Sequence, residues 1–183
     1  MQALDLLLNR SSQPRLQAPA PESSALENIL KCAVQAPDHR CLKPWRFIVC
    51  TGEGLDKLGR IFEKAAIARN AEASSVERAS QLPFRAPMVV VAICEYQAHD
   101  KVPRVEQIAS TACAIQAMQM AAIAQGFQGM WRTGSYATDE TVKRAFDCKD
   151  DDEIVGFLYL GTSVLKPMNR PEKAFDKHVS YWR

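Results

Sequence analysis

The alternation of hydrophobic and polar positions along the chain predicts a mixture of helices and strands. Apolar residues at helical spacing predict helices over residues 3–8, 22–35, 55–70, 105–125 and 138–146. Short apolar runs predict strands over residues 45–50, 88–94, 129–132 and 154–160. Because these elements mix without a strict strand–helix–strand alternation, the pattern favours an α+β sandwich over a doubly wound fold. The length of 183 residues suits one domain spanning residues 1–183.

The stretch between Gln107 and Trp131 contains no charged residue, although 24% of the chain is charged. A helix that is apolar on every side is expected to be buried on all sides, in a large core, a membrane or a subunit interface. Glutamines, hydroxyls and glycines interrupt this stretch and make it too polar for a membrane span. A large core and a subunit interface therefore remain as the alternatives.

Two segments lack the pattern of a packed element. Residues 71–83 are polar and weakly periodic, and we expect a mobile flap there. Residues 162–183 contain Pro167 and Pro171 and several basic residues, so we expect an extended tail that cannot form a core alone. The basic residues of this tail, Lys166, Arg170 and Lys173, could serve only solubility or could clamp a phosphate of a partner subunit.

The composition limits the classes of partner. A net charge of +2 and a pI of about 8.2 give no strong field that would attract nucleic acid or an anionic membrane, but leave small anionic ligands open. The N-terminus lacks the basic start and long apolar region of a signal peptide, so a cytoplasmic location is expected.

The six cysteines include no C-x-x-C pair, which argues against a zinc site and against a disulfide scaffold. We expect most of them to be buried, reduced thiols. No dinucleotide-binding G-x-G-x-x-G follows a strand, and the P-loop, H-E-x-x-H and G-x-S-x-G motifs are absent from the sequence. The three histidines have no metal-ligand spacing, so the sequence suggests neither hydrolysis nor metal chemistry.

Three short motifs are candidates for ligand binding. Arg10-Ser11-Ser12 offers a cation and two hydroxyls to a phosphate, or is only a helix end with turn serines. Ala36-Pro37-Asp38-His39 either presents His39 to a ring or only stops a helix, and the second interpretation is favoured for the motif taken alone. Trp131-Arg132-Thr133 could wall a pocket and pair with an anionic oxygen, or could be an edge strand with a surface arginine.

The order of these motifs carries more information than any one of them. Asn9-Arg10-Ser11-Ser12 follows a helix, Ala36-Pro37-Asp38-His39 precedes Pro44-Trp45, and AIQAMQMAAIAQGFQGMWRTG (114–134) comes before IVGFLYLGT (154–162). This ordered set resembles the FMN-dependent nitroreductase family, most of all the short, single-domain bacterial NAD(P)H nitroreductases. The resemblance extends from Met1 to about Gly161.

The resemblance implies a three-layer sandwich with a mainly antiparallel central sheet, in an intertwined homodimer whose two FMN sites lie between the subunits. It implies that Arg10, Ser11 and Ser12 hold the phosphate and ribityl chain, that Gln35 and His39 contact FMN from the partner chain, and that Trp131, Arg132 and Thr133 complete the site. It further implies that the C-terminal tail reaches the partner subunit and that NAD(P) contacts Ala121, Ala122, Ile123, Ala124, Gln125 and Gly126.

The sequence departs from the family pattern at two places. Ser11 stands where a bulkier residue is usual, and Arg170-Pro171-Glu172-Lys173 matches the usual basic tail only loosely, which leaves Lys173 as a weak phosphate candidate. With the resemblance in hand, we expect the uncharged helix to be the central helix of the dimer, with Cys113, Ile115 and Met118 as contacts between the two copies.

The predicted activity is a two-step transfer in which NAD(P)H gives a hydride to N5 of the flavin, leaves, and a nitroaromatic, quinone or similar acceptor then takes two electrons. No side chain is expected to be catalytic in the strict sense. One alternative is a flavin-binding store or redox sensor with little turnover, and another is a helical interaction module that binds no flavin. The sequence does not distinguish NADH from NADPH.

Overall fold

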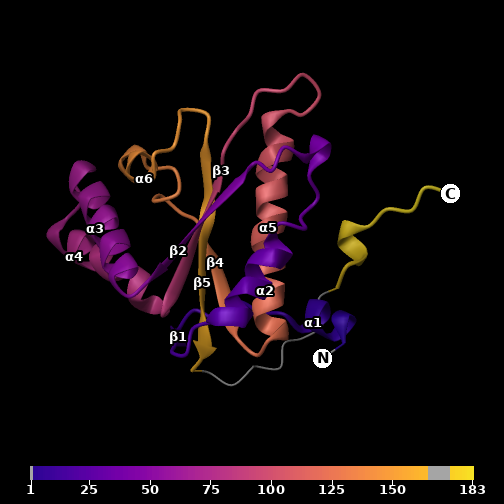
Figure 1. Cartoon of the computed structure of the whole chain (residues 1–183), viewed down its shortest axis with the longest axis horizontal. Coiled ribbons are helices and arrows are strands. Elements are labelled where there is room, and N and C mark those ends of the chain that lie inside the picture. Colours follow the sequence, from indigo (N-terminus) through magenta and orange to yellow (C-terminus); the bar gives the residue numbers. More distant parts are fainter. Residues whose placement is uncertain (1, 165–173) are drawn as a thin grey trace.

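The structure, a computed structural model, describes residues 2–164 and 174–183, and its middle layer is a five-stranded antiparallel sheet (Figure 1). Its strand order is β1-β5-β3-β2, with β4 paired to β5. The strands are β1 (Leu16–Gln17), β2 (Trp45–Thr51), β3 (Met88–Cys94), β4 (Gln128–Arg132) and β5 (Glu153–Ser163).

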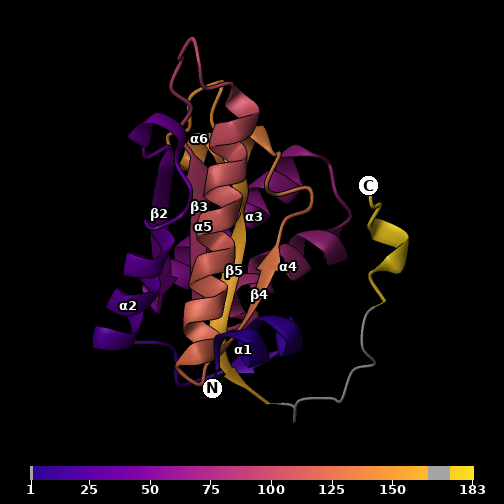
Figure 2. The same ribbon diagram turned by 90° about the vertical axis from the view of Figure 1, so that its right-hand side faces the viewer.

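Helices cover both sides of this sheet (Figures 1 and 2). On one side lie α1 (Ala3–Asn9), α2 (Ser23–Ala33) and α5 (Arg104–Ala124), and on the other lie α3 (Glu53–Ala68), α4 (Ala73–Gln81) and α6 (Glu140–Ala145). The described residues also form three short 3-10 helices, η1 (His39–Cys41), η2 (Pro83–Arg85) and η3 (Asp176–His178). The predicted three-layer α+β sandwich with an antiparallel sheet is confirmed.

Strand β3 explains why the chain forms two separate cores. All seven of its residues are buried, and it pairs antiparallel with β2 on one edge and with β5 on the other. Successive side chains of a strand point to opposite faces. Val89 and Val91 therefore join the core beneath α3, while Met88 and Val90 join the core beneath α2 and α5. A strand buried on both faces is consistent with its unbroken apolar sequence.

Helix α5, which has no charged residue from Gln107 onward, is buried on one side only. Ile115 and Met118 are fully buried against the sheet and α2, so the expectation that they form dimer contacts is wrong. The opposite side of α5 is open in the single chain, and Val105 is 69% exposed there. The expectation of burial on all sides thus fails for one chain, because the sheet and α2 cover only part of the helix. The open side carries the exposed or half-exposed uncharged residues Val105, Ala109, Cys113, Gln116, Ala117, Met120 and Ala124.

The segment expected to be a flap has regular structure. Residues 73–81 form helix α4, which packs on α3 through the buried Ala79. A Cβ at Gly59 of α3 would lie 2.5 Å from the carbonyl oxygen of Ser80, so the glycine permits this close approach. The polar composition that favoured a flap reflects one solvent-facing side of a short helix. The mobility of the segment stays a prediction.

The C-terminal tail begins later than the sequence indicates. Thr162 and Ser163 belong to β5 and pair with Gln17 and Leu16 of β1, which corrects the expected start at residue 162. The candidate phosphate residues Lys166, Arg170 and Lys173 lie outside the described residues. In the described part of the tail, Tyr181 and Trp182 are exposed, Trp182 by 98%.

The cysteines are more exposed than expected. Cys50 and Cys94 are buried and Cys148 is half-buried, but Cys32, Cys41 and Cys113 are exposed, so the expectation that most are buried is wrong. All six are free thiols. Among the described helices, none is both long enough and apolar enough to cross a bilayer.

Candidate functional site

The segment after α1 lies alongside β4, which brings two of the predicted motifs together. The backbone N–H of Gln13 donates to the carbonyl of Gly129 at 3.2 Å, and Nη2 of Arg132 donates to the carbonyl of Pro14 at 3.3 Å. Of the described strands, β4 pairs only with β5, so the segment occupies its other edge. Gln13 and Pro14, which directly follow the Arg10-Ser11-Ser12 motif, therefore contact β4 at Gly129 and Arg132, although about 120 positions separate the two segments in the chain.

A hollow of about 230 Å³ lies on one side of this segment, and we call it the Arg10 hollow. The residues that line it are Asp5, Leu6, Asn9, Arg10, Ser11, Gln13, Ile123 and Gln128. The Ser11 hydroxyl accepts a hydrogen bond from Gln13. Within residues 2–164 and 174–183, the side chains of Arg10 and Ser12 form neither a hydrogen bond nor an ion pair. A cation and a hydroxyl are thus available to an anionic ligand beside the hollow.

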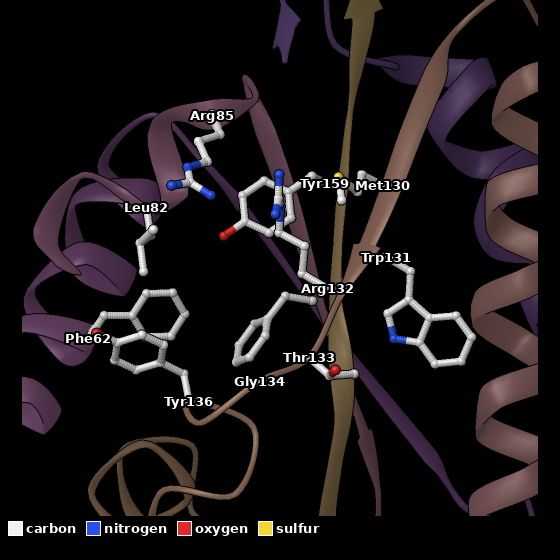
Figure 3. Close-up of a pocket in the computed structure, with 11 residues that line it drawn as sticks. Phe62, Leu82, Arg85, Met130, Trp131, Arg132, Thr133, Gly134, Tyr136 and Tyr159 are labelled. Atoms are coloured by element: carbon white, nitrogen blue, oxygen red, sulfur yellow. The ribbon is translucent and has the colours of Figure 1, made fainter. Parts of the chain in front are cut away.

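A second cavity of about 340 Å³ lies between the sheet and the α3–α4 side, and we call it the Arg132 pocket (Figure 3). Aromatic rings and two arginines form most of its wall: Phe62, Leu82, Arg85, Met130, Trp131, Arg132, Thr133, Gly134, Tyr136, Phe157 and Tyr159. The guanidinium carbon of Arg132 lies 5.4 Å from the centre of the Tyr159 ring. Thr133 and Gly134 are exposed and form part of the rim.

Charge in the Arg132 pocket is uncompensated. Burial lowers the pKa of the Arg132 guanidinium, and the like charge of Arg85 lowers it further. Burial also raises the pKa of the Tyr159 hydroxyl to about 12, against the opposing effect of the two arginines. Nε of Arg132 is buried and has no hydrogen-bond partner within the described residues. A buried donor without a partner is costly, so this atom is suited to meet a ligand acceptor.

The Trp131 indole and the Arg132 side chain lie on opposite faces of the sheet. The indole lies on the α5 side of the sheet, and its Nε1 donates to the carbonyl of Val155 at 3.2 Å (Figure 3). The reason is strand geometry, since neighbouring residues of β4 face opposite sides. The Trp131 ring therefore lies on the opposite side of the sheet from the Arg132 side chain, although Trp131 is among the residues that line the pocket, and its contact with FMN stays a prediction. Trp131 also fixes the position of β4 against β5.

His39 and Gln35 lie far from these cavities within one chain. Nδ1 of His39 is 2.8 Å from Oε2 of Glu106 in the first turn of α5, and the Ser110 hydroxyl donates to the Pro37 carbonyl at 2.6 Å. Gln35 is exposed, just after α2. Ile123 of the Arg10 hollow is in the last turn of α5, and 17 residues of helix span about 25 Å. The structure therefore does not bring His39 to Arg10 in one subunit.

The loop that carries His39 is held in an uncommon conformation. Arg40, Cys41 and Lys43 have φ values of 67°, 56° and 52°, which non-glycine residues rarely adopt. The Asp38 carboxylate accepts hydrogen bonds from the backbone N–H groups of Leu42 at 3.1 Å and Lys43 at 2.8 Å. Clusters of such residues are typical of functional sites, where the surroundings maintain the strain.

The segment predicted to contact NAD(P), residues 121–126, is mostly engaged in packing. Ala122 and Ile123 are buried, and the Gln125 amide donates to the carbonyls of Ala25 at 3.2 Å and Ala121 at 3.0 Å. Ala124 and Gly126 are exposed. This is also the carbonyl end of α5, whose partial negative charge disfavours a pyrophosphate. The assignment of this segment to NAD(P) stays a prediction.

Three residues of these sites were not anticipated from the sequence. Arg85 and Tyr159 line the Arg132 pocket, and Glu106 pairs with His39. Tyr159 carried a signal, because it is the one hydroxyl-bearing residue in the apolar run 154–160. Arg85 and Glu106 sit in polar stretches that resemble ordinary surface. Among the described residues, no group of three or more His, Cys, Asp or Glu side chains could hold a metal ion.

The chain is similar in sequence to bacterial proteins that are named putative NAD(P)H nitroreductases. The model of the nitroreductase family matches residues 7–162. The protein named Putative NAD(P)H nitroreductase YdjA, from Escherichia coli (strain K12), is 46% identical over 166 residues, which cover 91% of each chain. The protein named Putative NAD(P)H nitroreductase, from Haemophilus influenzae, is 36% identical over 167 residues, which cover 91% of each chain.

Solved structures show the same fold. The nitroreductase-like family protein of Bacillus cereus superposes with a TM-score of 0.87 at 20% identity, covering 100% of this chain and 96% of that one. A mutant of the FMN and NADPH-dependent nitroreductase NfnB, from Sphigopyxis sp. strain HMH, superposes with a TM-score of 0.73 at 17% identity over 99% of both chains. With the family match over most of its length, the chain belongs to the nitroreductase family and is an oxidoreductase.

Proposed function

We propose that the protein is a homodimeric, FMN-dependent NAD(P)H oxidoreductase that passes two electrons to a nitroaromatic, a quinone or a similar acceptor by a ping-pong mechanism. The names of its bacterial relatives refer to NAD(P)H, and the name of one structural neighbour refers to FMN and NADPH. These names support the cofactor pair without identifying the acceptor. FMN, when bound, supplies the chemistry of accepting a hydride and releasing two electrons.

The observation that carries the proposal is the set of unused donors beside β4. The Arg10 guanidinium and the Ser12 hydroxyl have no partner among the described residues, and Arg132 has a buried Nε without one. Buried or half-buried donors of this kind are normally satisfied. A ligand with a phosphate at one end and ring oxygens at the other fits this donor set. Arg10 and Ser12 would bind the phosphate, and the backbone near Thr133 would orient the ring.

The separation of His39 from Arg10 supports a dimeric site. Both residues belong to motifs of the family resemblance, yet they lie at opposite ends of α5, about 25 Å apart along the helix. A single ligand the size of FMN cannot meet both in one chain. Two chains whose α5 helices run antiparallel would bring the His39 of one to the Arg10 of the other. The open, uncharged side of α5 offers such a contact surface.

In this arrangement the protein binds FMN, orients it and shields it from water. Arg10 supplies a charge-assisted hydrogen bond to the phosphate. Glu106, 2.8 Å from Nδ1 of His39, would fix the imidazole and leave Nε2 available to a ligand. The apolar α5 surface excludes water from one side of the site.

FMN binding tests the proposal directly. The purified protein is titrated with FMN, and absorbance near 450 nm and flavin fluorescence report binding. We expect saturable binding, with a Kd that rises about 10- to 100-fold in Arg10→Ala, because one charged hydrogen bond contributes about 1.5–3 kcal/mol. Arg60→Ala, which removes an exposed arginine of α3, is the matched control and should leave the Kd unchanged.

Anaerobic mixing of the loaded protein with NADH or NADPH then separates an enzyme from a flavin store. Bleaching of the flavin, followed by its recovery on addition of a quinone or a nitroaromatic, supports turnover. A flavin that never bleaches would identify a store or sensor. A protein that takes up no FMN at all would overturn the proposal.

A further inference from the structure

Helix α1 carries three leucines on a face that the described residues leave uncovered. Leu4, Leu7 and Leu8 are 70%, 57% and 81% exposed, and no residue of α1 is buried. Their spacing of three and four positions places them on one side of the helix, and we call this side the leucine stripe. Isolated helices shorter than about 12 residues are marginal in water, and α1 has only seven. An apolar stripe on so short a helix indicates a contact with something outside the described chain.

The other face of α1 lines the Arg10 hollow. Asp5, Leu6 and Asn9 contribute to its wall, and Arg10 follows directly on the helix. Since successive residues of a helix are rotated by about 100°, these positions point away from the leucine stripe. Helix α1 is therefore a thin partition between the stripe and the donors that we propose for the FMN phosphate. Whatever covers the stripe also holds these donors in place.

A second exposed apolar surface lies at the opposite end of α5. Val105, in the first turn of α5, is 69% exposed, and Val34, just after α2, is 50% exposed; we call this pair the valine patch. The segment after α2 lies against the first turn of α5, where Nδ1 of His39 is 2.8 Å from Oε2 of Glu106. Helix α1 lies at the last turn of α5, because Ile123 lines the same hollow as α1. The leucine stripe and the valine patch are thus about 25 Å apart and do not meet in one chain.

A second copy of the chain is the occupant that fits both surfaces. The open side of α5 lies between them, and Figure 2 shows α1 beside one end of that helix, with the sheet behind both. This side carries mainly small residues such as Ala109, Cys113 and Ala117. A stable interface buries about 800 Å² on each partner, more than one helix face of small side chains supplies. If two α5 helices pack antiparallel about a two-fold axis, each leucine stripe meets the valine patch of the other chain, and the contact is extended at both ends.

We propose that the leucine stripe of each subunit docks on the valine patch of its partner, and that this contact holds the Arg10-Ser11-Ser12 motif in position for FMN. The inference rests on the dimeric FMN site proposed above and adds its regulation, since FMN binding and dimer formation become coupled. Such coupling is reciprocal. FMN therefore tightens the dimer by the same factor by which dimer formation tightens FMN binding.

The test measures the dissociation constant of the dimer by analytical ultracentrifugation, with and without FMN, in the natural protein and in Leu8→Gln. This constant should rise about 100-fold in Leu8→Gln, because two symmetric contacts each lose the burial of one leucine side chain. Leu8→Met keeps an apolar side chain and should keep the natural value. Ile67→Gln is the matched control, since Ile67 is an apolar residue of α3, 57% exposed, on the other side of the sheet. An unchanged dimer in Leu8→Gln would overturn the proposal.

FMN titrations at protein concentrations below and above the dissociation constant of the dimer show how α1 acts. In Leu8→Gln we expect weak FMN binding at the low concentration and the natural Kd at the high one, where the dimer forms again. Weak binding at every concentration would confine the effect of α1 to its own chain. A natural Kd at the low concentration would show that FMN binding and dimer formation are independent. Either result refutes the coupling.

The variant Val105→Gln tests which surface receives the leucine stripe. It should also weaken the dimer, and the double variant with Leu8→Gln should weaken it by less than the product of the two single effects, because residues in contact are not additive. A full product would place the stripe on another surface and overturn the docking. The ultracentrifugation needs no FMN. A protein that took up no flavin would thus overturn the proposed function, while the docking of α1 would still be measured.

Discussion

The Trp131 indole lies directly against the backbone of Gly156. A Cβ at position 156 would come well inside contact distance of Nε1 of Trp131, 2.6 Å from its Cδ1 and 2.8 Å from the carbonyl oxygen of Arg132. The same Nε1 donates to the Val155 carbonyl at 3.2 Å. The absence of a side chain at Gly156 thus allows the indole to join β4 to β5, and it fixes the strand from which Arg132 enters its pocket.

Replacing Gly156 with alanine should destabilise the protein by about 2–3 kcal/mol, because the indole and the backbone of β4 must both move. Urea unfolding followed by circular dichroism measures this change. Gly54→Ala is the control, since a Cβ there meets only Cys50 at an ordinary 3.6 Å and lies in a helix, so it should not destabilise. Equal stability of Gly156→Ala and the natural protein would show that the indole is free to move aside.

Stability should fall in alkaline solution because of Tyr159. Burial raises the pKa of its hydroxyl to about 12, above the value of about 10 in an unfolded chain. The unfolded state therefore loses its proton first, and the contribution that is complete below pH 10 is lost as pH rises toward 12. The loss should reach roughly 2–3 kcal/mol. Urea unfolding at pH 9 and pH 11 should show a smaller decrease for Tyr159→Phe than for the natural protein; equal decreases would assign the effect to other groups.

The sequence predicted most elements because their patterns are local. The β3 run and the spacing of apolar residues in α3 and α5 identify each element without knowledge of its neighbours. Helix α6 was predicted from residue 138 and begins at Glu140, with the Asp139 carboxylate just before it accepting from the N–H groups of Thr141 and Val142. The two-residue strand β1 was missed because it exists only through its pairing with β5.

The site was less predictable because its parts meet only after folding. Two hydrogen bonds join Gln13 to Gly129 and Pro14 to Arg132 across distant segments, and no local pattern encodes those bonds. The direction of the Trp131 ring follows from the register of β4, in which a shift of one residue exchanges the two faces. Arg85 was missed for the same reason, since an arginine before a strand has the appearance of ordinary surface until the Arg132 pocket forms around it.

Asp38 should control the conformation of the loop that carries His39. Its carboxylate satisfies two backbone N–H groups in a turn with three residues of positive φ. Asp38→Ala should lower stability by about 1–2 kcal/mol and weaken FMN binding in the proposed site, because the strained turn loses its acceptor. Unfolding curves and FMN titration measure the two effects. Asp100→Ala, at an exposed position to which no described residue donates, is the control; unchanged FMN affinity in Asp38→Ala would remove His39 from the proposed site.

A charge placed on the open side of α5 should separate the two subunits. Cys113 is exposed there in one chain, in the middle of a helix face without charged residues. If two copies meet on this face, Cys113→Arg would bury an unpaired cation in the contact, which costs several kcal/mol. We expect size-exclusion chromatography with light scattering to show a monomer. The FMN affinity should fall in the same variant, because His39 of one chain and Arg10 of the other would no longer meet.

The control is Ile67→Arg, which places the same charge on an apolar residue of α3 that is 57% exposed; this variant should remain dimeric and bind FMN normally. A Cys113→Arg protein that stays dimeric would place the contact elsewhere, and one that becomes monomeric with full FMN affinity would show that a single chain builds the whole site.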